Sequence, residues 1–268
     1  MPENRLDLEM TERGLCKSRE HAKRLIKSHK VIVDGRVCEK PSRTVTDETK
    51  IAVTGDVHRY VGRGGLKLEK AVDLYKINLK GKVCLDIGAS TGGFTDCMLQ
   101  NGASLVYALD VGHSQLDEKL IRDSRVVNME KTNIRETSTE TFDKKIDFIA
   151  TDVSFISLKL VLPKIKELLS DSGHAVVLVK PQFEAGKSNL SKTGIVRDRR
   201  VHRQILLDIT DFAANLGFTV SGVCVSPVRG GSGNSEYLMY LSNKKDISDM
   251  VYYNIDELVN EALRKEIK

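Results

Sequence analysis

The amino-acid sequence predicts an α/β fold: a mostly parallel, doubly wound sheet with an antiparallel C-terminal hairpin, preceded by a small α+β unit. From Val61 onward, short apolar runs alternate with segments of helical pattern, and three of the runs end in an aspartate. This alternation is typical of βαβ units, whose crossover helices cover a parallel sheet. Two β-type runs, 218–226 and 236–242, are joined by a glycine-rich segment, which predicts the hairpin.

The first 54 residues are expected to form a separate small domain. Their pattern changes from helical to β-type, and Asp34-Gly35 predicts a tight turn between two strands. Residues 55–60 are expected to be a linker, so that the larger domain spans 61–268. The elements expected in the small domain are helices at 5–15 and 17–27, and strands at 31–33, 36–37 and 51–53.

The larger domain is expected to carry its functional groups at one edge of the sheet. Asp86, Asp110 and Asp152 each end an apolar run, and the carboxyl ends of parallel strands meet at the same edge. Open α/β sheets bind their ligands there. The strands expected before the hairpin are 83–86, 105–110, 148–152 and 175–179, and the expected helices are 93–101, 114–123, 157–170, 199–216 and 246–264.

Composition limits the class of protein. The net charge is +5, and the first 60 residues hold thirteen basic and ten acidic side chains, which favours a polyanionic partner. A mildly basic protein without such a partner remains the alternative.

The five cysteines are widely spaced without a C-x-x-C pair, which indicates reduced thiols rather than disulfides or a zinc site. The longest apolar run, 175–179, is far too short for a membrane span, so we expect a cytoplasmic protein without a membrane partner or a metal.

A glycine-rich segment, Asp86-Ile87-Gly88-Ala89-Ser90-Thr91-Gly92-Gly93-Phe94, lies between a predicted strand and a predicted helix. Glycines let the backbone approach a ligand closely, and a helix start offers free N–H groups. A dinucleotide site fits poorly, because Ser90 would take the middle glycine's place and Asp86 would repel a pyrophosphate. An acid there suits the cationic S-adenosylmethionine better, although a purely structural turn is the alternative. The candidate cofactor residues are Asp86, Gly88, Ser90, Gly92, Gly93, Phe94, Asp110 for the ribose, Val111, Asn133 for the adenine, and Asp152.

Four further residues lie at strand ends or glycine-rich turns: Lys67, Asp152, Lys180 and Glu236. Each alone is compatible with a solvated salt bridge, but together they indicate a lysine-centred pocket that activates a hydroxyl. We assign Lys180 as the base or hydroxyl-steering group. Asp152 is expected between the methyl donor and Lys180, Lys67 supplies a second cation, and Glu236 is expected to orient Lys180.

Basic residues recur along the second predicted helix. Arg19, Lys23 and Lys27 are spaced by four and share one helix face, which is the pattern of a nucleic-acid binder or of a solvated face. Four arginines, at 197, 199, 200 and 203, follow a polar loop at 185–194 that either closes over RNA or simply connects to a helix.

These motifs resemble the haemolysin A (TlyA) family of ribosomal RNA 2′-O-methyltransferases, within the wider RrmJ/FtsJ group. The similarity covers nearly the whole chain. In the small domain, 5–7, 18–26 and 31–35 resemble an S4 RNA-binding domain, with His29 where that family usually has glycine. The stretches that carry the larger similarity are 61–68 (VGRGGLKL), 86–96 (DIGASTGGFTD), 151–158 (TDVSFISL), 179–184 (VKPQFE) and 233–237 (GNSEY).

The resemblance implies S-adenosylmethionine as the donor, a Lys67–Asp152–Lys180–Glu236 tetrad, and 2′-O-methylation of a ribose, with cytidine as the expected nucleoside. It implies ribosomal RNA or ribosomal subunits as the partner. The candidate RNA-binding residues are Arg5, Arg19, Lys23, Lys27 and Arg63. Two alternatives stay open: an RNA-binding or ribosome-assembly factor without catalysis, and a haemolysin-like protein.

Overall fold

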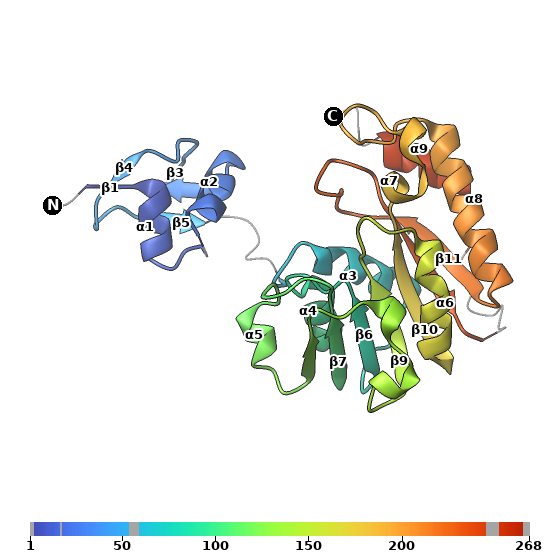
Figure 1. Ribbon diagram of the computed structural model, residues 1–268. Helices are drawn as coiled ribbons and strands as arrows, with labels where there is room; N and C mark the ends of the chain where they lie inside the picture. The colour runs from blue at the N-terminus through green and yellow to red at the C-terminus, as the bar shows by residue number, and fades with distance from the viewer. Residues whose placement is uncertain (1–2, 17, 54–58, 245–251, 265–268) are drawn as a thin grey trace. The chain divides into compact units, whose positions relative to one another are not determined.

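The computed structural model describes residues 3–16, 18–53, 59–244 and 252–264. It divides into two compact units, Met1–Arg59 and Tyr60–Lys268, each with its own hydrophobic core (Figure 1). Most of the linker expected at 55–60 lies outside the described residues. Tyr60, assigned to that linker by the sequence, is instead a buried core residue of the second unit, where its hydroxyl donates to Glu69.

The N-terminal unit consists of two helices and short antiparallel strand pairs around a small apolar core. The predicted tight turn is present: Asp34 and Gly35 both have positive φ, which matches the twist of a two-residue hairpin. The helix predicted at 5–15 is shorter at both ends: Arg5 pairs with Thr44 in a strand that was not predicted, and the helix ends at Glu12, before Gly14 with φ 67°. The elements are β1 (Asn4–Arg5), α1 (Leu6–Glu12), α2 (Arg19–Lys27), β2 (Val31–Val33), β3 (Arg36–Val37), β4 (Thr44–Val45) and β5 (Ile51–Val53).

The second unit is built on a seven-stranded sheet with strand order β11-β12-β10-β9-β6-β7-β8. The strands β6 to β10 run parallel, and β12 runs antiparallel to both β10 and β11, so the predicted fold class and C-terminal hairpin are confirmed. The strands are β6 (Val83–Ile87), β7 (Leu105–Leu109), β8 (Val126–Met129), β9 (Ile146–Thr151), β10 (Leu169–Val179), β11 (Thr219–Val225) and β12 (Tyr237–Ser242).

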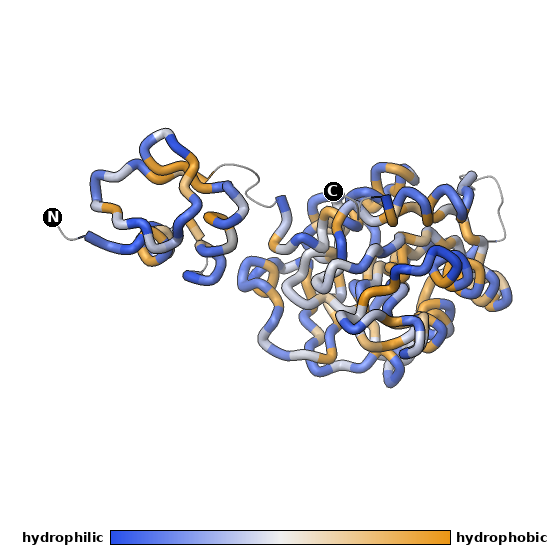
Figure 2. Tube along the Cα trace, turned by 90° about the horizontal axis from the view of Figure 1, so that it is seen from above, coloured by the Kyte–Doolittle hydropathy of each residue, from blue (hydrophilic) through white to orange (hydrophobic). Residues whose placement is uncertain are grey.

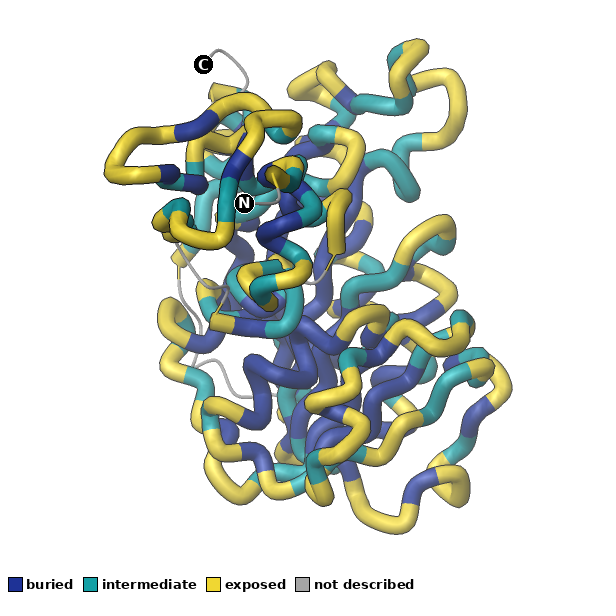
Figure 3. The backbone as a smooth tube through the Cα atoms, turned by 90° about the vertical axis from the view of Figure 1, so that its left-hand side faces the viewer, coloured by how far each residue is buried: buried dark blue, intermediate teal, exposed yellow. Residues whose placement is uncertain are grey.

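Helices cover both faces of this sheet. One face packs against α6, α8 and α9, and the other packs against α3, α4 and α5, which gives three layers with two apolar interfaces. Figure 3 shows the buried strands at the centre of this unit and exposed loops around them, and Figure 2 shows hydrophobic and hydrophilic stretches alternating along its chain. The helices are α3 (Gly64–Tyr75), α4 (Gly93–Gln100), α5 (Glu118–Ile121), α6 (Leu162–Leu168), α7 (Pro181–Glu184), α8 (Arg199–Asn215) and α9 (Ile255–Arg264).

Several elements of this unit differ from the sequence prediction, and the helix expected at 114–123 is reduced to α5 (Glu118–Ile121). Helix α3 was not predicted, and neither was the edge strand β8. The helix expected at 157–170 ends at Leu168, and Leu169 already pairs with Ile146 as the first residue of β10. The predicted helix at 246–264 is described only from Ile255, since 245–251 lie outside the described residues. No helix in the described ranges is long and apolar enough to cross a membrane.

Helices α3 and α4 approach each other very closely at their first turns. A side chain on Gly93 would place its Cβ 2.9 Å from the backbone nitrogen of Gly65, and one on Gly65 would meet the buried ring of Tyr60 at 2.3 Å. Both distances are shorter than real Cβ contacts, so this approach requires glycine at both positions. The close approach fixes the start of α3 beside the glycine-rich loop that precedes α4.

Candidate active site

Three neighbouring strands bring three of the four predicted catalytic residues together. Lys180 directly follows β10, and Asp152 directly follows β9, its parallel neighbour. Glu236 directly precedes β12, whose first residue Tyr237 pairs with Val179 at the end of β10. The antiparallel direction of β12 therefore places its amino end at the same edge as the carboxyl ends of β9 and β10.

Lys67 completes the cluster from the first turns of α3. Its Nζ lies 2.8 Å from Glu236 Oε2 and 3.1 Å from Asp152 Oδ2. Lys180 Nζ lies 2.6 Å from Asp152 Oδ1 and donates to Ser154 Oγ at 2.9 Å. The four side chains thus form one chain of ion pairs in the order Glu236, Lys67, Asp152, Lys180.

This order corrects one expectation. The sequence suggested that Glu236 orients Lys180, but the carboxylate of Glu236 binds Lys67 instead. Lys180 is oriented by Asp152 and by Ser154, a residue that the sequence analysis did not single out. Ser154 lies within the stretch 151–158, which carries part of the family resemblance, but its hydrogen bond with Lys180 was not predicted. Lys67 contacts both carboxylates and is central to the cluster.

The cluster is buried and electrically balanced. Burial pulls the pKa of Lys67 down, but the charges of Asp152 and Glu236 outweigh it, and the net pKa is raised. Burial likewise raises the pKa of Asp152, but Lys67 and Lys180 outweigh it and hold that pKa below its usual value. Asp152 is therefore an ionised hydrogen-bond acceptor at neutral pH, and Lys67 is a stable ammonium. Neither group is suited to take a proton from a substrate hydroxyl.

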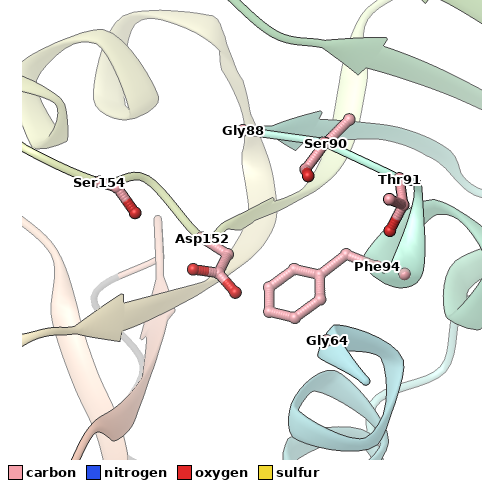
Figure 4. Close-up of a pocket in the computed structure, with 9 residues that line it drawn as sticks. Gly64, Gly88, Ser90, Thr91, Phe94, Asp152 and Ser154 are labelled. Carbon is pink, nitrogen blue, oxygen red and sulfur yellow. The ribbon is translucent and has the colours of Figure 1, made fainter. Parts of the chain in front are cut away.

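A first cavity of about 220 Å³ lies between the glycine-rich loop and the residues that follow β9. Figure 4 shows Asp152 and the ring of Phe94 pointing toward the space between them, with Ser90, Thr91 and Ser154 around it. Gly88 and Gly93 contribute bare backbone, so a ligand can approach the main chain there. The residues that line this first cavity are Gly64, Gly88, Ala89, Ser90, Thr91, Gly93, Phe94, Asp152 and Ser154.

A second cavity of about 270 Å³ lies on the other side of Asp152. Four basic and two acidic side chains line it, and the glycine-rich segment before β12 contributes Val228 to Gly231 to its wall. Gly64 and Asp152 line both cavities, so the two adjoin at these residues. The lining residues are Arg63, Gly64, Lys67, Asp152, Lys180, Val228, Arg229, Gly230, Gly231 and Glu236. Arg229 and its two glycines were missed by the sequence analysis, although they lie in the predicted hairpin connection.

Asp86 lies beneath the glycine-rich loop rather than in the first cavity. Its side chain is fully buried, and its Oδ2 accepts from the backbone N–H and hydroxyl of Thr95, in the first turn of α4. Its Oδ1 is buried without a hydrogen-bond partner among the described residues. Burial raises the pKa of Asp86 to about 7, against the two hydrogen bonds from Thr95. Asp86 therefore supports the loop from below.

This raised pKa predicts how stability depends on pH. Between its ordinary value and about 7, folded Asp86 binds a proton that the unfolded chain has released, so stability falls as pH rises through this window. We expect the free energy of unfolding of the wild type to fall, relative to Asp86→Asn, by on the order of 3 kcal/mol from pH ~4 to pH ~8. Urea titrations of both proteins across this range measure it. Parallel pH curves would contradict the prediction.

The remaining candidate cofactor residues are distributed around the loop. Asp110 accepts from the backbone N–H groups of Ser90 and Gly112, so it joins the loop to the end of β7. Val111 is 72% exposed beside it. Asn133 caps a short 3-10 turn through the N–H of Arg135 and donates to Glu136, and it does not line the first cavity. Gly92 is the N-cap of α4, and a Cβ there would meet Leu116 and Leu120.

Comparison with known proteins agrees with this geometry. Residues 60–243 match the FtsJ-like methyltransferase family, and residues 4–51 match the S4 domain. The chain belongs to the FtsJ-like methyltransferase family. It is similar to the Mycobacterium tuberculosis "16S/23S rRNA (cytidine-2'-O)-methyltransferase TlyA", at 42% identity over 90% of this chain and 91% of that protein.

Two further relatives carry a different name. "Hemolysin A" of Brachyspira hyodysenteriae is 42% identical over 88% of this chain and 98% of its own length. A solved structure from Streptococcus thermophilus with a provisional hemolysin name is 43% identical, with a TM-score of 0.78, and the match covers 100% of this chain and 98% of that one.

The first cavity of this FtsJ-like methyltransferase fits the cationic methyl donor that the fold implies. The backbone of the glycine-rich loop lines it beside the apolar ring of Phe94, and the ionised Asp152 supplies negative charge at the far wall. The residues from Gly88 to Thr91, with Gly93 and Phe94, line the cavity in which the donor would bind, whereas Asp110, Val111 and Gly92 do not line it. Among the described residues no cluster of side chains could hold a metal ion.

The S4 domain places two of its candidate RNA-binding cations around one buried acid. Arg5 and Arg19 each lie 3.0 Å from the carboxylate of Asp7, which is inaccessible, while both guanidinium side chains are nearly half exposed. Asp7 thus holds both arginines at the surface. Lys23 pairs with Glu20 at 2.6 Å, and Lys27 is exposed on the same helix. His29 adopts the left-handed conformation, with φ 58°, at the position where glycine is usual.

Proposed function

We propose that this protein transfers a methyl group from S-adenosylmethionine to a ribose 2′-hydroxyl of ribosomal RNA, with cytidine as the target nucleoside. One observation carries the proposal: the glycine-lined first cavity and the basic second cavity meet at Asp152, beside Lys180. A donor in the first cavity and a ribose in the second would face each other there. The name of the Mycobacterium tuberculosis relative supports the choice of RNA and nucleoside.

The donor supplies an activated methyl group on a positively charged sulfur. Asp152 faces this cavity with a carboxylate whose lowered pKa keeps it charged, so it favours a cationic donor over a neutral one. Phe94 offers an apolar wall, and the loop from Gly88 to Thr91 offers backbone groups. These groups bind and orient the donor and supply no proton transfer.

Lys180 is the residue that we propose to act on the ribose. Its ammonium has three hydrogens, and Asp152 and Ser154 accept two of them. The third can bind the 2′-hydroxyl oxygen and steer a lone pair toward the methyl carbon, in line with the bond that breaks. Asp152 and Ser154 fix the direction of this steering.

The reaction also releases one proton. As the carbon–oxygen bond forms, the hydroxyl becomes an ether oxygen, the positive charge on sulfur is lost, and the hydroxyl proton must leave. Lys180 can take this proton only when its amine carries two hydrogens, which Asp152 and Ser154 accept. Its lone pair, in place of the third hydrogen, then faces the acceptor cavity. Lys67 and Glu236 hold Asp152 in place and keep the cluster balanced.

The N-terminal unit supports an RNA substrate. Arg5 and Arg19 present guanidinium groups at the surface, where they can bind phosphates. Lys23, Lys27 and, in the second unit, Arg63 are further cations that we assign to RNA contacts. A protein acting on ribosomal RNA works where ribosomes assemble, so we propose a cytoplasmic location.

The proposal is tested with purified small and large ribosomal subunits and donor labelled in the methyl group. We expect label to enter ribosomal RNA and to be recovered in alkali-resistant dinucleotides, because a 2′-O-methyl group blocks cleavage at its own ribose. Label in alkali-labile nucleotides would contradict ribose methylation. Subunit binding without any transfer would instead support an assembly factor, and lysis of liposomes without donor would support the hemolysin name.

A further inference from the structure

A strongly basic segment also lies in the second unit, joined to the wall of the second cavity. Residues 187–203 contain six basic side chains and one acid, so the net charge of this segment equals the net charge of the whole chain, +5. The sequence analysis placed the basic excess mainly in the first 60 residues and left the role of this segment open. We propose that residues 187–200 are a second RNA-contact surface, which binds the phosphate backbone flanking the target nucleotide. This inference rests on the proposed function.

The cations of this segment are available to a partner. Lys187, Lys192, Arg197 and Arg199 are exposed, and among the described residues none of them lies within ion-pair distance of an acid. The nearby acids are already engaged elsewhere. Asp198 caps α8 and pairs with Arg200, Asp256 pairs with Arg203, and Glu184 binds the hydroxyl of Ser157 and the N–H of Leu158.

The segment is tied to the wall of the second cavity by a buried amide. Asn234 is 1% exposed, its Oδ1 accepts from the N–H of Val196 at 3.0 Å, and its Nδ2 donates to the carbonyl of Gly194 at 3.0 Å. Asn234 lies two residues before Glu236, which lines that cavity. The basic segment is therefore joined to the active site through the chain segment that carries Glu236.

A second buried contact, from His202, also holds the backbone of Val196. His202 is fully buried, its Nε2 lies 3.0 Å from the carbonyl of Val196, and its Nδ1 lies 2.8 Å from the hydroxyl of Tyr237. Since a carbonyl only accepts, Nε2 donates to it. Val196 is thus fixed between β12 and α8, which argues against a mobile connector. Cations on a fixed segment lose little conformational entropy when they bind.

The chemistry of these side chains favours phosphates as the bound groups. Lysines and arginines spread over an exposed segment match a polyanion with repeated charges, and such contacts carry no base specificity. The second cavity adds Arg63 and Arg229 close to the proposed ribose position. A strand whose ribose enters that cavity carries phosphates on both sides of it, and the basic segment would receive one side.

The test compares two matched charge reversals in the full-length protein. Lys187→Glu with Lys192→Glu removes two cations from the segment. Lys144→Glu with Lys145→Glu makes the same change in net charge at two exposed lysines before the amino end of β9, at the opposite edge of the sheet. The dissociation constant for ribosomal subunits is measured at several salt concentrations, and methyl transfer and donor affinity are measured separately.

We expect the segment variant to bind ribosomal subunits about tenfold more weakly, and its logarithmic salt dependence to lose about 0.7 per phosphate contact removed from a single strand. The control pair should stay within about threefold of the wild type, in line with a general charge effect. Donor affinity, and turnover with saturating subunits, should not change in either variant. Equal weakening in both variants, or lower turnover with unchanged subunit binding, would overturn the proposal. Absence of methyl transfer by the wild type would contradict the proposed function but not the RNA-contact surface, because subunit binding is measured without turnover.

Discussion

Replacement of Lys180 by methionine should lower the rate of methyl transfer by about 10³-fold, the usual size of a lost proton-transfer group. Methionine keeps most of the buried volume and removes the ammonium that Asp152 and Ser154 hold. Donor affinity should change little, since Lys180 does not line the first cavity. Single-turnover transfer to ribosomal subunits and calorimetry with the donor measure the two quantities. Lys145→Met, at an exposed site, is the control and should behave as the wild type.

A second variant separates the two roles assigned to Lys180. Arginine keeps the positive charge and its hydrogen bonds but cannot act as a proton acceptor near neutral pH. Loss of transfer in Lys180→Arg as well as Lys180→Met supports the base. Substantial activity in Lys180→Arg would show that steering by charge suffices. Wild-type rates in Lys180→Met would remove Lys180 from the mechanism.

Replacement of Gly88 by alanine should weaken donor binding by at least about tenfold and lower transfer by about 10²-fold, the loss typical of a small displacement of catalytic groups. Gly88 has φ +85°, and an added Cβ would lie 2.8 Å from the carbonyl oxygen of Asp152. The backbone that carries Asp152 must then shift. Because Asp152 pairs with both lysines, the shift disturbs both cavities.

Gly81→Ala is the matched control for this substitution. Gly81 also has positive φ, at +73°, but an added Cβ would meet nothing within 4 Å. Both variants therefore carry a left-handed strain of roughly 1–2 kcal/mol, and only Gly88→Ala adds the close contact. Melting temperatures measure the shared cost, and donor affinity measures the difference. Equal donor affinity in the two variants would show that the approach of Gly88 to Asp152 is unimportant.

Much of the fold was predictable because the signals are local. Short apolar runs ending in aspartates predicted β6 and β7 within one residue and β9 within two, and the glycine-rich segment correctly separated a strand from a helix. Helix α3 was missed because it begins with two glycines, which disfavour helix in isolation. A Cβ on Gly65 would meet the ring of Tyr60 at 2.3 Å, so packing explains the second glycine, while a Cβ on Gly64 would make only an ordinary contact with Phe94 of α4. The edge strand β8 is short, and its Val127 and Asn128 are exposed, so its apolar signal is weak.

The sequence by itself determined which residue types stand at the sheet edge: an acid at the end of β6, acids directly after β7 and β9, a lysine after β10 and a glutamate before β12. Only the tertiary structure decided their partners. The register of β12 against β10 and the position of α3 place Glu236 on Lys67, leave Lys180 to Asp152 and Ser154, and bury Asp86 under its loop. The physical reason is that the signal for a strand end lies in residues adjacent in the sequence. Ion pairs depend on distances between segments that are far apart in the chain.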